Sequence, residues 1–278
     1  MSIPLSHDFK KFMEIVDLNL YNEIMDLRNY SFLAPPTLLP LLSYMDKNSI
    51  TDYYPNNNTR DYLERVLGRK RCTDTTLPLR QLKTFKNYNN IHYDVPDEIN
   101  NYLNSLTDEI KMLLPSDLDW QSLFLLLYES LINIYKHSGF DKGYILCQKY
   151  PNRNITDICL IDDGISIPGS FEKFGFDFID DSEVIYEAIN GKSTDKEKEG
   201  IHGRGLNTSA RLTSLGFDEE MLIASREGLC IINQNGAKIK EIDSYYVEGT
   251  FITIRVNNKK IGQKLFDYLP LRTIHKIK

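Results

Sequence analysis

Two stretches in the middle of the chain place apolar residues three or four positions apart, which puts them on one face of an α-helix. The stretches are residues 97–114 and 119–137, and we expect a helix over each. The apolar positions are Ile99, Tyr102, Leu103, Leu106, Ile110, Leu113 and Leu114 in the first, and Leu123, Leu126, Leu127, Leu131, Ile132 and Ile134 in the second.

After the second helix the pattern changes to short apolar runs bounded by turn-forming residues, which predicts strands. A hairpin is expected from strands at 143–149 and 154–161, joined by a turn at 150–153. A helix at 182–189 then leads into residues 190–200, which are charged and poor in apolar residues, as in a mobile lid. The remaining expected elements are a helix at 205–215 ending at Gly216, and strands at 220–225, 228–234 and 249–256.

The first 85 or so residues predict a small α/β unit of their own. A short strand at 22–27 is followed by a turn at 32–36 and a largely apolar helix at 37–45. Residues 52–58 are rich in turn formers and predict a loop, and a second helix is expected at 59–67 with Thr59 as its N-cap. The polar segment 83–94 then suggests two domains, residues 1–88 and 89–278.

Composition limits the function classes. The chain has 278 residues, 41% of them hydrophobic, which suffices for a substantial core, and a net charge of -6, which argues against nucleic-acid binding. No apolar run is long enough to span a bilayer, and the N-terminus lacks a secretory signal pattern. The four cysteines, Cys72, Cys147, Cys159 and Cys230, are scattered, as expected for buried thiols in a reducing compartment. We expect a cytoplasmic protein that does not associate with membranes.

Glu129 and Asn133 lie one turn apart on the second helix and therefore project from the same side. Such a pair on an otherwise apolar helix costs desolvation unless a polar group fills the space between them. A hydrated Mg²⁺ with phosphate oxygens would fill it, with Asn133 holding the metal and Glu129 orienting or deprotonating a water. The alternative is a solvated polar edge of an amphipathic helix. For the following Lys136 and His137, favourable charge at a helix C-terminus is a sufficient explanation.

Asp162 and Gly164 follow an apolar strand directly. A carboxylate at that point can accept a hydrogen bond from an exocyclic amine such as adenine N6, and sites of this kind discriminate strongly against bases that lack the amine. Gly164 allows the backbone to pass close to a flat base. A simple Asp-Asp-Gly turn between two elements is the alternative.

Gly203, Arg204, Gly205 and Leu206 open a helix directly after the charged segment. Glycines there keep side chains away from the first turn, so that backbone N–H groups can face phosphates. A glycine-rich turn needed only for packing is the alternative. Thr250 begins the last strand, where its hydroxyl can bind a base or a bridging water.

In this order and spacing, the four segments resemble the GHKL superfamily of gyrase, heat-shock chaperone, histidine kinase and MutL ATPases. The resemblance covers residues 119–256 and implies the Bergerat fold, an α/β sandwich in which ATP lies between a mixed sheet and helices. It implies Mg²⁺ on Asn133, adenine on Asp162 with Gly164, phosphates near Gly203, Gly205 and Leu206, and a base contact at Thr250. Ser166 departs from the pattern, which usually has a glycine there.

The N-terminal unit also resembles a known class: residues 25–45 are similar to the strand–turn–helix core of STAS-like domains. No phosphoacceptor histidine motif precedes the polar helix, which argues against a self-phosphorylating sensor kinase. As a stand-alone ATP-binding protein, the chain most resembles the anti-sigma factor serine kinases. This resemblance implies ATP–Mg²⁺ binding and regulation of a protein partner, and it allows a homodimer. Four alternatives stay open: a protein serine/threonine kinase, an ATPase whose Glu129 activates water, a non-catalytic nucleotide sensor or scaffold, and an α/β interaction module in which the motifs are accidental.

Overall fold

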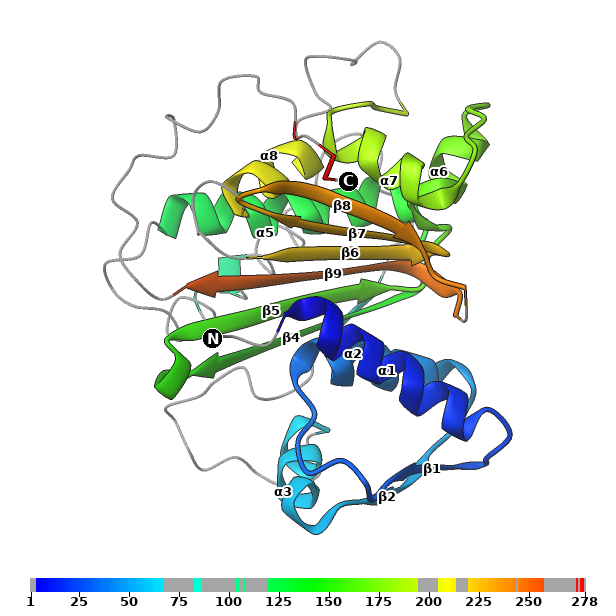
Figure 1. Ribbon diagram of the computed structural model, residues 1–278, viewed down its shortest axis with the longest axis vertical. Coiled ribbons are helices and arrows are strands. Elements are labelled where there is room, and N and C mark those ends of the chain that lie inside the picture. Colours follow the sequence, from blue (N-terminus) through cyan, green and yellow to red (C-terminus); the bar gives the residue numbers. More distant parts are fainter. Residues whose placement is uncertain are drawn as a thin grey trace.

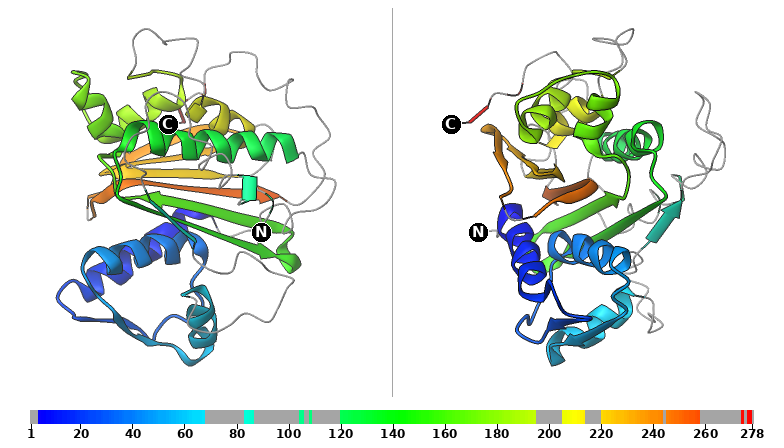
Figure 2. Two further views of the ribbon diagram at one scale, coloured as in Figure 1. Left: turned by 180° about the vertical axis from the view of Figure 1, so that it is seen from behind. Right: turned by 90° about the vertical axis from the view of Figure 1, so that its right-hand side faces the viewer.

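The computed structural model describes residues 4–67, 83–86, 104–105, 108, 120–194, 205–213, 220–243, 245–257, 274 and 276–277. Within these residues the chain forms a seven-stranded sheet with helices on both faces, so that three layers are visible in the edge-on view (Figure 1, Figure 2). The expected mixture of helices and strands is confirmed. The helix expected at 97–114 and the boundary near residue 88 lie mostly outside the described residues.

The sheet has the strand order β3-β4-β5-β9-β6-β7-β8, in which the last strand of the chain lies in the middle. The resemblance implied a mixed sheet, whereas all six pairings between these strands are antiparallel. Hairpins that join neighbours, as in β4–β5 and β6–β7–β8, produce this arrangement. The strands are β3 Lys83–Lys86, β4 Lys142–Tyr150, β5 Ile155–Asp162, β6 Met221–Arg226, β7 Gly228–Asn233, β8 Gly236–Glu241 and β9 Val247–Asn257.

One face of the sheet is covered by the four helices that the structure describes within residues 120–211 (Figure 2). Leucines of α5 pack with isoleucines of β5 and β9 in a continuous apolar core. The helix expected at 119–137 is confirmed, and its last turn is a π-helical turn, Ile134–Ser138, that ends at Gly139 with a φ of 59°. The helices are α5 Trp120–Asn133, α6 Ser166–Lys173, α7 Asp181–Ile189 and α8 Gly205–Arg211.

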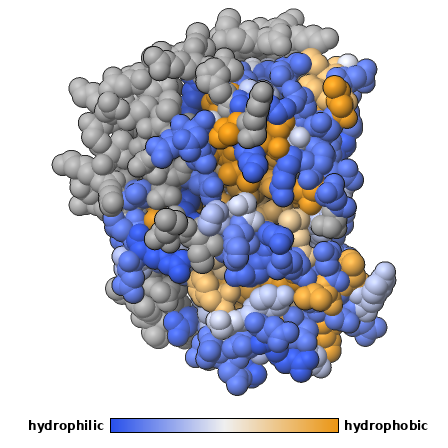
Figure 3. All heavy atoms as spheres, in the orientation of Figure 1, coloured by the Kyte–Doolittle hydropathy of each residue, from blue (hydrophilic) through white to orange (hydrophobic). Residues whose placement is uncertain are grey.

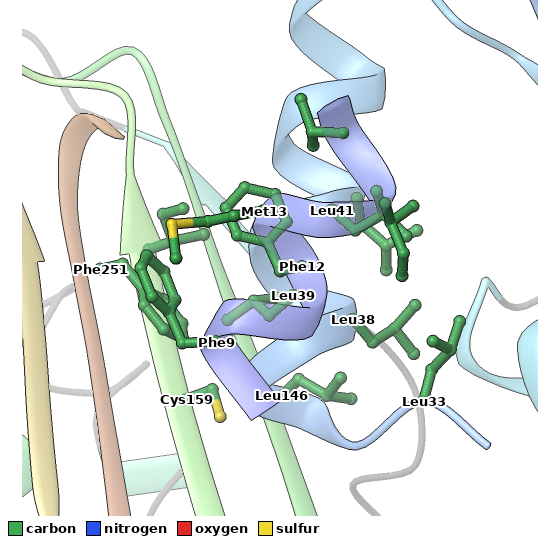
Figure 4. Packing of buried hydrophobic residues seen from close by; sticks show 14 of the residues in the cluster. Phe9, Phe12, Met13, Leu33, Leu38, Leu39, Leu41, Leu146, Cys159 and Phe251 are labelled. Atoms are coloured by element: carbon green, nitrogen blue, oxygen red, sulfur yellow. The ribbon is translucent and has the colours of Figure 1, made fainter. Parts of the chain in front are cut away.

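The opposite face is covered by the N-terminal helices. Their apolar residues form one core with the sheet residues that point toward them, as the close-up shows for Phe9 beside Phe251 (Figure 4). These two rings stack with centroids 5.6 Å apart. The elements are α1 Leu5–Asn19, α2 Pro35–Lys47 and α3 Asn57–Val66, with a parallel pair, β1 Ile24–Leu27 and β2 Asp52–Pro55. The N-terminal unit thus shares its core with the large sheet.

A buried ionic cluster ties α1 to this face of the sheet. The Arg255 guanidinium of β9 donates to both carboxylate oxygens of Asp157 on β5, at 2.6 and 2.8 Å, and contacts Asp8 of α1 at 3.4 Å. All three side chains are buried. A buried carboxylate without such a partner would cost several kcal/mol, so Asp157 depends on the Arg255 guanidinium for its burial.

Two expectations for the N-terminal unit are wrong. The loop expected at 52–58 contains β2, because pairing with β1 satisfies its backbone and the adjacent Tyr53 and Tyr54 suit a strand. The following helix α3 begins two residues before Thr59 and is capped by Asn56, whose side chain accepts from the Asn58 N–H at 3.0 Å. An earlier polar residue that reaches the free N–H groups takes the capping role.

Hydrophilic residues cover most of the described surface on the face shown in Figure 3, and hydrophobic residues show in smaller areas. Cys147, Cys159 and Cys230 are buried thiols, as expected, while Cys72 lies outside the described residues. None of the helices in the described ranges combines the length and the apolar character required to cross a bilayer.

Candidate functional site

A pocket with a cavity volume of about 130 Å³, partly open to solvent, lies between the sheet and helices α5–α8. Sites for small organic ligands combine apolar walls with a few polar groups. This pocket fits that description. Its apolar wall consists of Ile134, Ile167, Phe171, Ala188, Leu206 and Ile252, and its polar lining includes Asn133, Asp162 and Thr250.

Asp162 is the last residue of β5 and is 1% exposed. Its Oδ1 accepts from the Gly164 N–H at 2.9 Å, whereas its Oδ2 has no hydrogen-bond partner among the described residues. Burial raises the pKa of this carboxyl from 3.8 to about 7, against the opposing effect of the Gly164 N–H and, to a smaller extent, of the nearby Ser138 hydroxyl and Thr250 N–H. An unsatisfied buried acceptor at a pocket wall is the feature that a hydrogen-bond donor on a ligand would complete.

The turn after Asp162 is packed too tightly for side chains at two glycines. A Cβ on Gly164 would lie 2.5 Å from the Ser138 Cβ, at the end of the π-helical turn. Gly249 has a φ of 71°, and a Cβ there would overlap the carbonyl oxygen of Asp162. The Ile165 N–H donates to the Ser138 carbonyl oxygen at 2.8 Å and holds the turn in place. The glycines therefore fix Asp162 at the pocket wall.

Glu129 and Asn133 meet the beginning of α8. A Cβ on Gly205 would lie 2.7 Å from Glu129 Oε2 and 2.9 Å from Asn133 Nδ2. Burial raises the pKa of Glu129, and the positive charge of Lys136 opposes that rise. The solvated polar edge considered from the sequence does not describe Glu129, because its carboxylate is partly withdrawn from water beneath α8.

Thr250 lies opposite Asp162 in the β5–β9 pairing. Its Oγ1 is 3.2 Å from Ser225 Oγ, which accepts from the Ile167 N–H at 3.0 Å and donates to the Gly249 carbonyl oxygen at 2.7 Å. These bonds attach the beginning of α6 to the sheet. Along β9, Thr250 and Ile252 line the pocket, while Phe251 between them faces α1.

Ser166 occupies the position where the GHKL pattern usually has glycine, and its φ is 75°. This left-handed conformation is favourable for glycine and costs other residues roughly 1–2 kcal/mol. Ser166 Oγ accepts from the Gly169 N–H at 3.0 Å, which caps α6 and offsets part of that cost. The backbone thus takes the conformation that suits glycine although the side chain is present.

The structure brings most of the expected residues together. Asn133, Asp162, Gly205, Leu206 and Thr250 line the pocket, and Glu129 and Gly164 contact residues that do. Gly203 and Arg204 lie outside the described residues, as does most of the expected lid.

Sequence reasoning missed several lining residues, among them Ser138, Ser170, Phe171, Lys192, Ser193 and Thr194. Only the last three had a signal, since Lys192 begins the charged segment. The neighbouring Asp163 has a structural role: its Oδ1 accepts from the backbone N–H groups of Asp141 and Lys142 at 2.8 and 2.9 Å.

Comparison with known proteins gives no family: no family model matches the chain, and no curated protein matches its sequence. Among the described residues, no three His, Cys, Asp or Glu side chains gather as a metal site would require.

Proposed function

We propose that the chain is an ATP–Mg²⁺-binding regulatory protein of the GHKL type, a cytoplasmic kinase or ATPase that acts on a protein partner. The observation that carries the proposal is the unsatisfied Oδ2 of Asp162 beside an apolar wall. The adenine N6 amine is a donor that suits this acceptor, and the flat base suits the wall. Guanine has an oxygen in place of that amine, so its carbonyl would face the carboxylate.

The proposed fold is the Bergerat sandwich, here with an antiparallel sheet, preceded by a STAS-like unit. The position of the pocket between the sheet and α5–α8 supports the first part of this proposal. The order β1, α2, β2, α3 with a parallel β1–β2 pair supports the second.

Asn133 fits a Mg²⁺ site of the kind that uses few protein ligands, since its amide oxygen is a hard donor at the pocket wall. A bound Mg²⁺ would neutralise charge on the phosphates of the nucleotide. Glu129 would accept the proton of the attacking hydroxyl, from a partner serine or threonine in a kinase and from water in an ATPase. The burial that raises the pKa of Glu129 favours this role, because a more basic carboxylate accepts a proton more readily.

Calorimetric titration with ATP and GTP, with and without Mg²⁺, tests the proposal. We expect ATP to bind more tightly with Mg²⁺, GTP to bind far more weakly, and Asp162→Asn to weaken ATP binding about a hundredfold. Asp163→Asn is the matched control, since this carboxylate accepts hydrogen bonds from the backbone N–H groups of Asp141 and Lys142 at the beginning of β4. Equal affinities for ATP and GTP, or an unchanged affinity in Asp162→Asn, would remove the assignment of the base contact.

Turnover is tested by Glu129→Gln. This variant keeps the size of the side chain and removes its basicity, so we expect ATP affinity within about twofold of wild type and at least a hundredfold slower turnover. Radiolabelled ATP with candidate partner proteins separates the two activities: label on a partner indicates a kinase, and free phosphate alone indicates an ATPase. Normal turnover in Glu129→Gln would assign the base to another residue.

One observation favours a non-catalytic nucleotide sensor as the second candidate. Glu129 is not among the described residues that line the pocket, and the beginning of α8 covers its carboxylate. If α8 stays there when ATP is bound, the nucleotide orders the site without being hydrolysed. Tight Mg²⁺-dependent binding with no turnover in either wild type or Glu129→Gln would establish this function.

A further inference from the structure

One wall of the pocket carries a lysine that lies over two aromatic rings. Lys192 Nζ is 4.7 Å from the ring centroid of Phe178 and 5.6 Å from that of Phe176. The two rings are stacked with centroids 6.4 Å apart and pack edge-on against Phe171 of α6, in a small apolar cluster that also includes Val184 and Ala188 of α7. Cations bind favourably to such ring faces. The rings therefore restrict the lysine side chain to a small region beside the pocket.

The backbone of this residue is fixed as well. The Lys192 N–H donates to the Glu187 carbonyl oxygen at 3.1 Å, and the preceding Gly191 donates to Ala188 at 3.1 Å with a φ of 97°. The end of α7 is in turn bonded to α8, because Asn207 Nδ2 donates to the Ile189 carbonyl oxygen at 2.5 Å. Lys192 thus projects from a well-supported turn close to α8, the helix whose first residue contacts Glu129 and Asn133.

Among the described residues, the ammonium group has one weak carboxylate partner. Glu187 Oε2 is 3.8 Å away, and both side chains are about one-third exposed. Ion pairs of this kind contribute little stability. Among the described lining residues, Lys192 carries the permanent positive charge, and Ser193 and Thr194 beside it place hydroxyl groups on the same wall. The wall at Lys192 therefore suits an anionic group of a ligand, whereas the wall at Asp162 suits a hydrogen-bond donor.

We propose that Lys192, held by Phe176 and Phe178, binds the phosphate chain of the nucleotide, together with the hydroxyl groups of Ser193 and Thr194. The proposal rests on the proposed function, since it assigns the phosphate end of the same ligand. The ammonium group supplies up to three N–H donors to phosphate oxygens. Because the rings already restrict the side chain, less conformational entropy is lost on binding. Affinity should therefore depend on the number of phosphates.

The test compares adenosine, AMP, ADP, ATP and inorganic tripolyphosphate by calorimetry, with wild type and Lys192→Met. Methionine keeps an apolar chain over the rings and removes the charge. We expect ATP affinity to fall about tenfold and adenosine affinity to stay unchanged. The matched control is Lys173→Met, which removes an exposed positive charge from the end of α6, outside the pocket lining, and should leave ATP affinity unchanged.

Two further variants test the role of the rings. Lys192→Arg keeps the charge and should restore most of the ATP affinity. Phe178→Leu removes the nearer ring face and should weaken ATP binding about threefold, less than the loss of the charge itself. The same affinity for ATP in Lys192→Met as in wild type, or an equal loss for adenosine and ATP, would overturn the assignment.

The two proposals fail in different ways. If wild type binds adenosine and ATP but Lys192→Met binds ATP normally, the nucleotide site stands and the lysine assignment is wrong. If wild type binds no adenosine or ATP but binds tripolyphosphate in a Lys192-dependent way, the anion-binding role stands and the ATP proposal is wrong. If wild type binds none of these ligands, both are wrong.

Discussion

Strand β5 carries two buried aspartates, five residues apart, on opposite faces of the sheet. Asp157 faces the N-terminal helices and is bonded by Arg255 through two hydrogen bonds, with Asp8 nearby. Asp162 faces the pocket and has one oxygen without a partner in the described part of the chain. Burial raises the pKa of both carboxyls, but only Asp157 has a cation to oppose that rise.

The difference separates a structural acid from an acid suited to ligand binding. Where the partner is inside the protein, the buried charge holds two elements together, as Arg255 joins α1 to the sheet. Where the partner is missing, the protein bears a cost of burial that a ligand can remove. The two faces of one strand therefore differ in whether their polar groups are satisfied, although both are buried.

The largest effect is expected from Arg255→Met, which removes the partner and leaves Asp157 and Asp8 buried without a cation. The free energy of unfolding should fall by roughly 3–5 kcal/mol, measured by urea denaturation at pH 7.5. The double variant Arg255→Met with Asp157→Asn should recover part of the loss, because it removes the buried charge. A loss below about 1 kcal/mol would show that the N-terminal face does not depend on this ion pair.

Asp162→Asn should raise the free energy of unfolding, whereas Arg255→Met should lower it. The folded protein raises the pKa of Asp162 from 3.8 to about 7, so ionising it costs stability. That cost is absent below about pH 4, grows as the pH rises toward 7, and is complete above it. We expect the unliganded variant to be more stable than wild type by roughly 2–4 kcal/mol at pH 8, and by much less at pH 4.

The measurement is urea denaturation of both proteins across this pH range without nucleotide. Asp163→Asn is the matched control, since it makes the same substitution at the next residue, an exposed carboxylate that accepts two backbone N–H bonds. A difference between wild type and Asp162→Asn that stays constant from pH 4 to 8 would contradict the contrast between the two aspartates.

The smallest effect concerns Ser166. Ser166→Gly removes the side chain that makes a φ of 75° unfavourable and also removes the bond to Gly169, so the net gain in unfolding free energy should be about 0.5 kcal/mol. Ser166→Ala keeps the unfavourable backbone and loses the cap, so it should lose about 1 kcal/mol. Thermal denaturation of the two variants in parallel measures both, and a loss in Ser166→Gly would mean that the cap outweighs the strain.

Periodicity predicted the elements that have a clear inside and outside. It predicted α2, α5 and α7 and the strands β4, β5, β6, β7 and β9, because their apolar residues face one of the two cores. It missed α6, whose first turn contains Ser166 and Pro168 and looks like a loop, and β8, a strand with many polar residues near the sheet edge. Helix α1 had usable spacing, with Leu5, Phe9, Phe12 and Val16 on one side, and was overlooked.

For the candidate site, the sequence supplied residues whose type and neighbours were unusual, such as Asp162 after an apolar strand. It could not supply Ser138 or Phe171, which reach the pocket only because a π-helical turn and an unexpected helix place them there. The rings that hold Lys192 are also distant from it in sequence. Contacts of this kind depend on tertiary packing, which local patterns do not encode.

Strand β9 is a wall shared by two compartments, with Thr250 and Ile252 toward the pocket and Phe251 toward α1. Because side chains alternate along a strand, inserting or deleting one residue before Thr250 would turn the pocket residues toward α1 and the α1-facing residues toward the pocket. Random mutagenesis screened for altered ligand binding should return substitutions under the N-terminal helices as well.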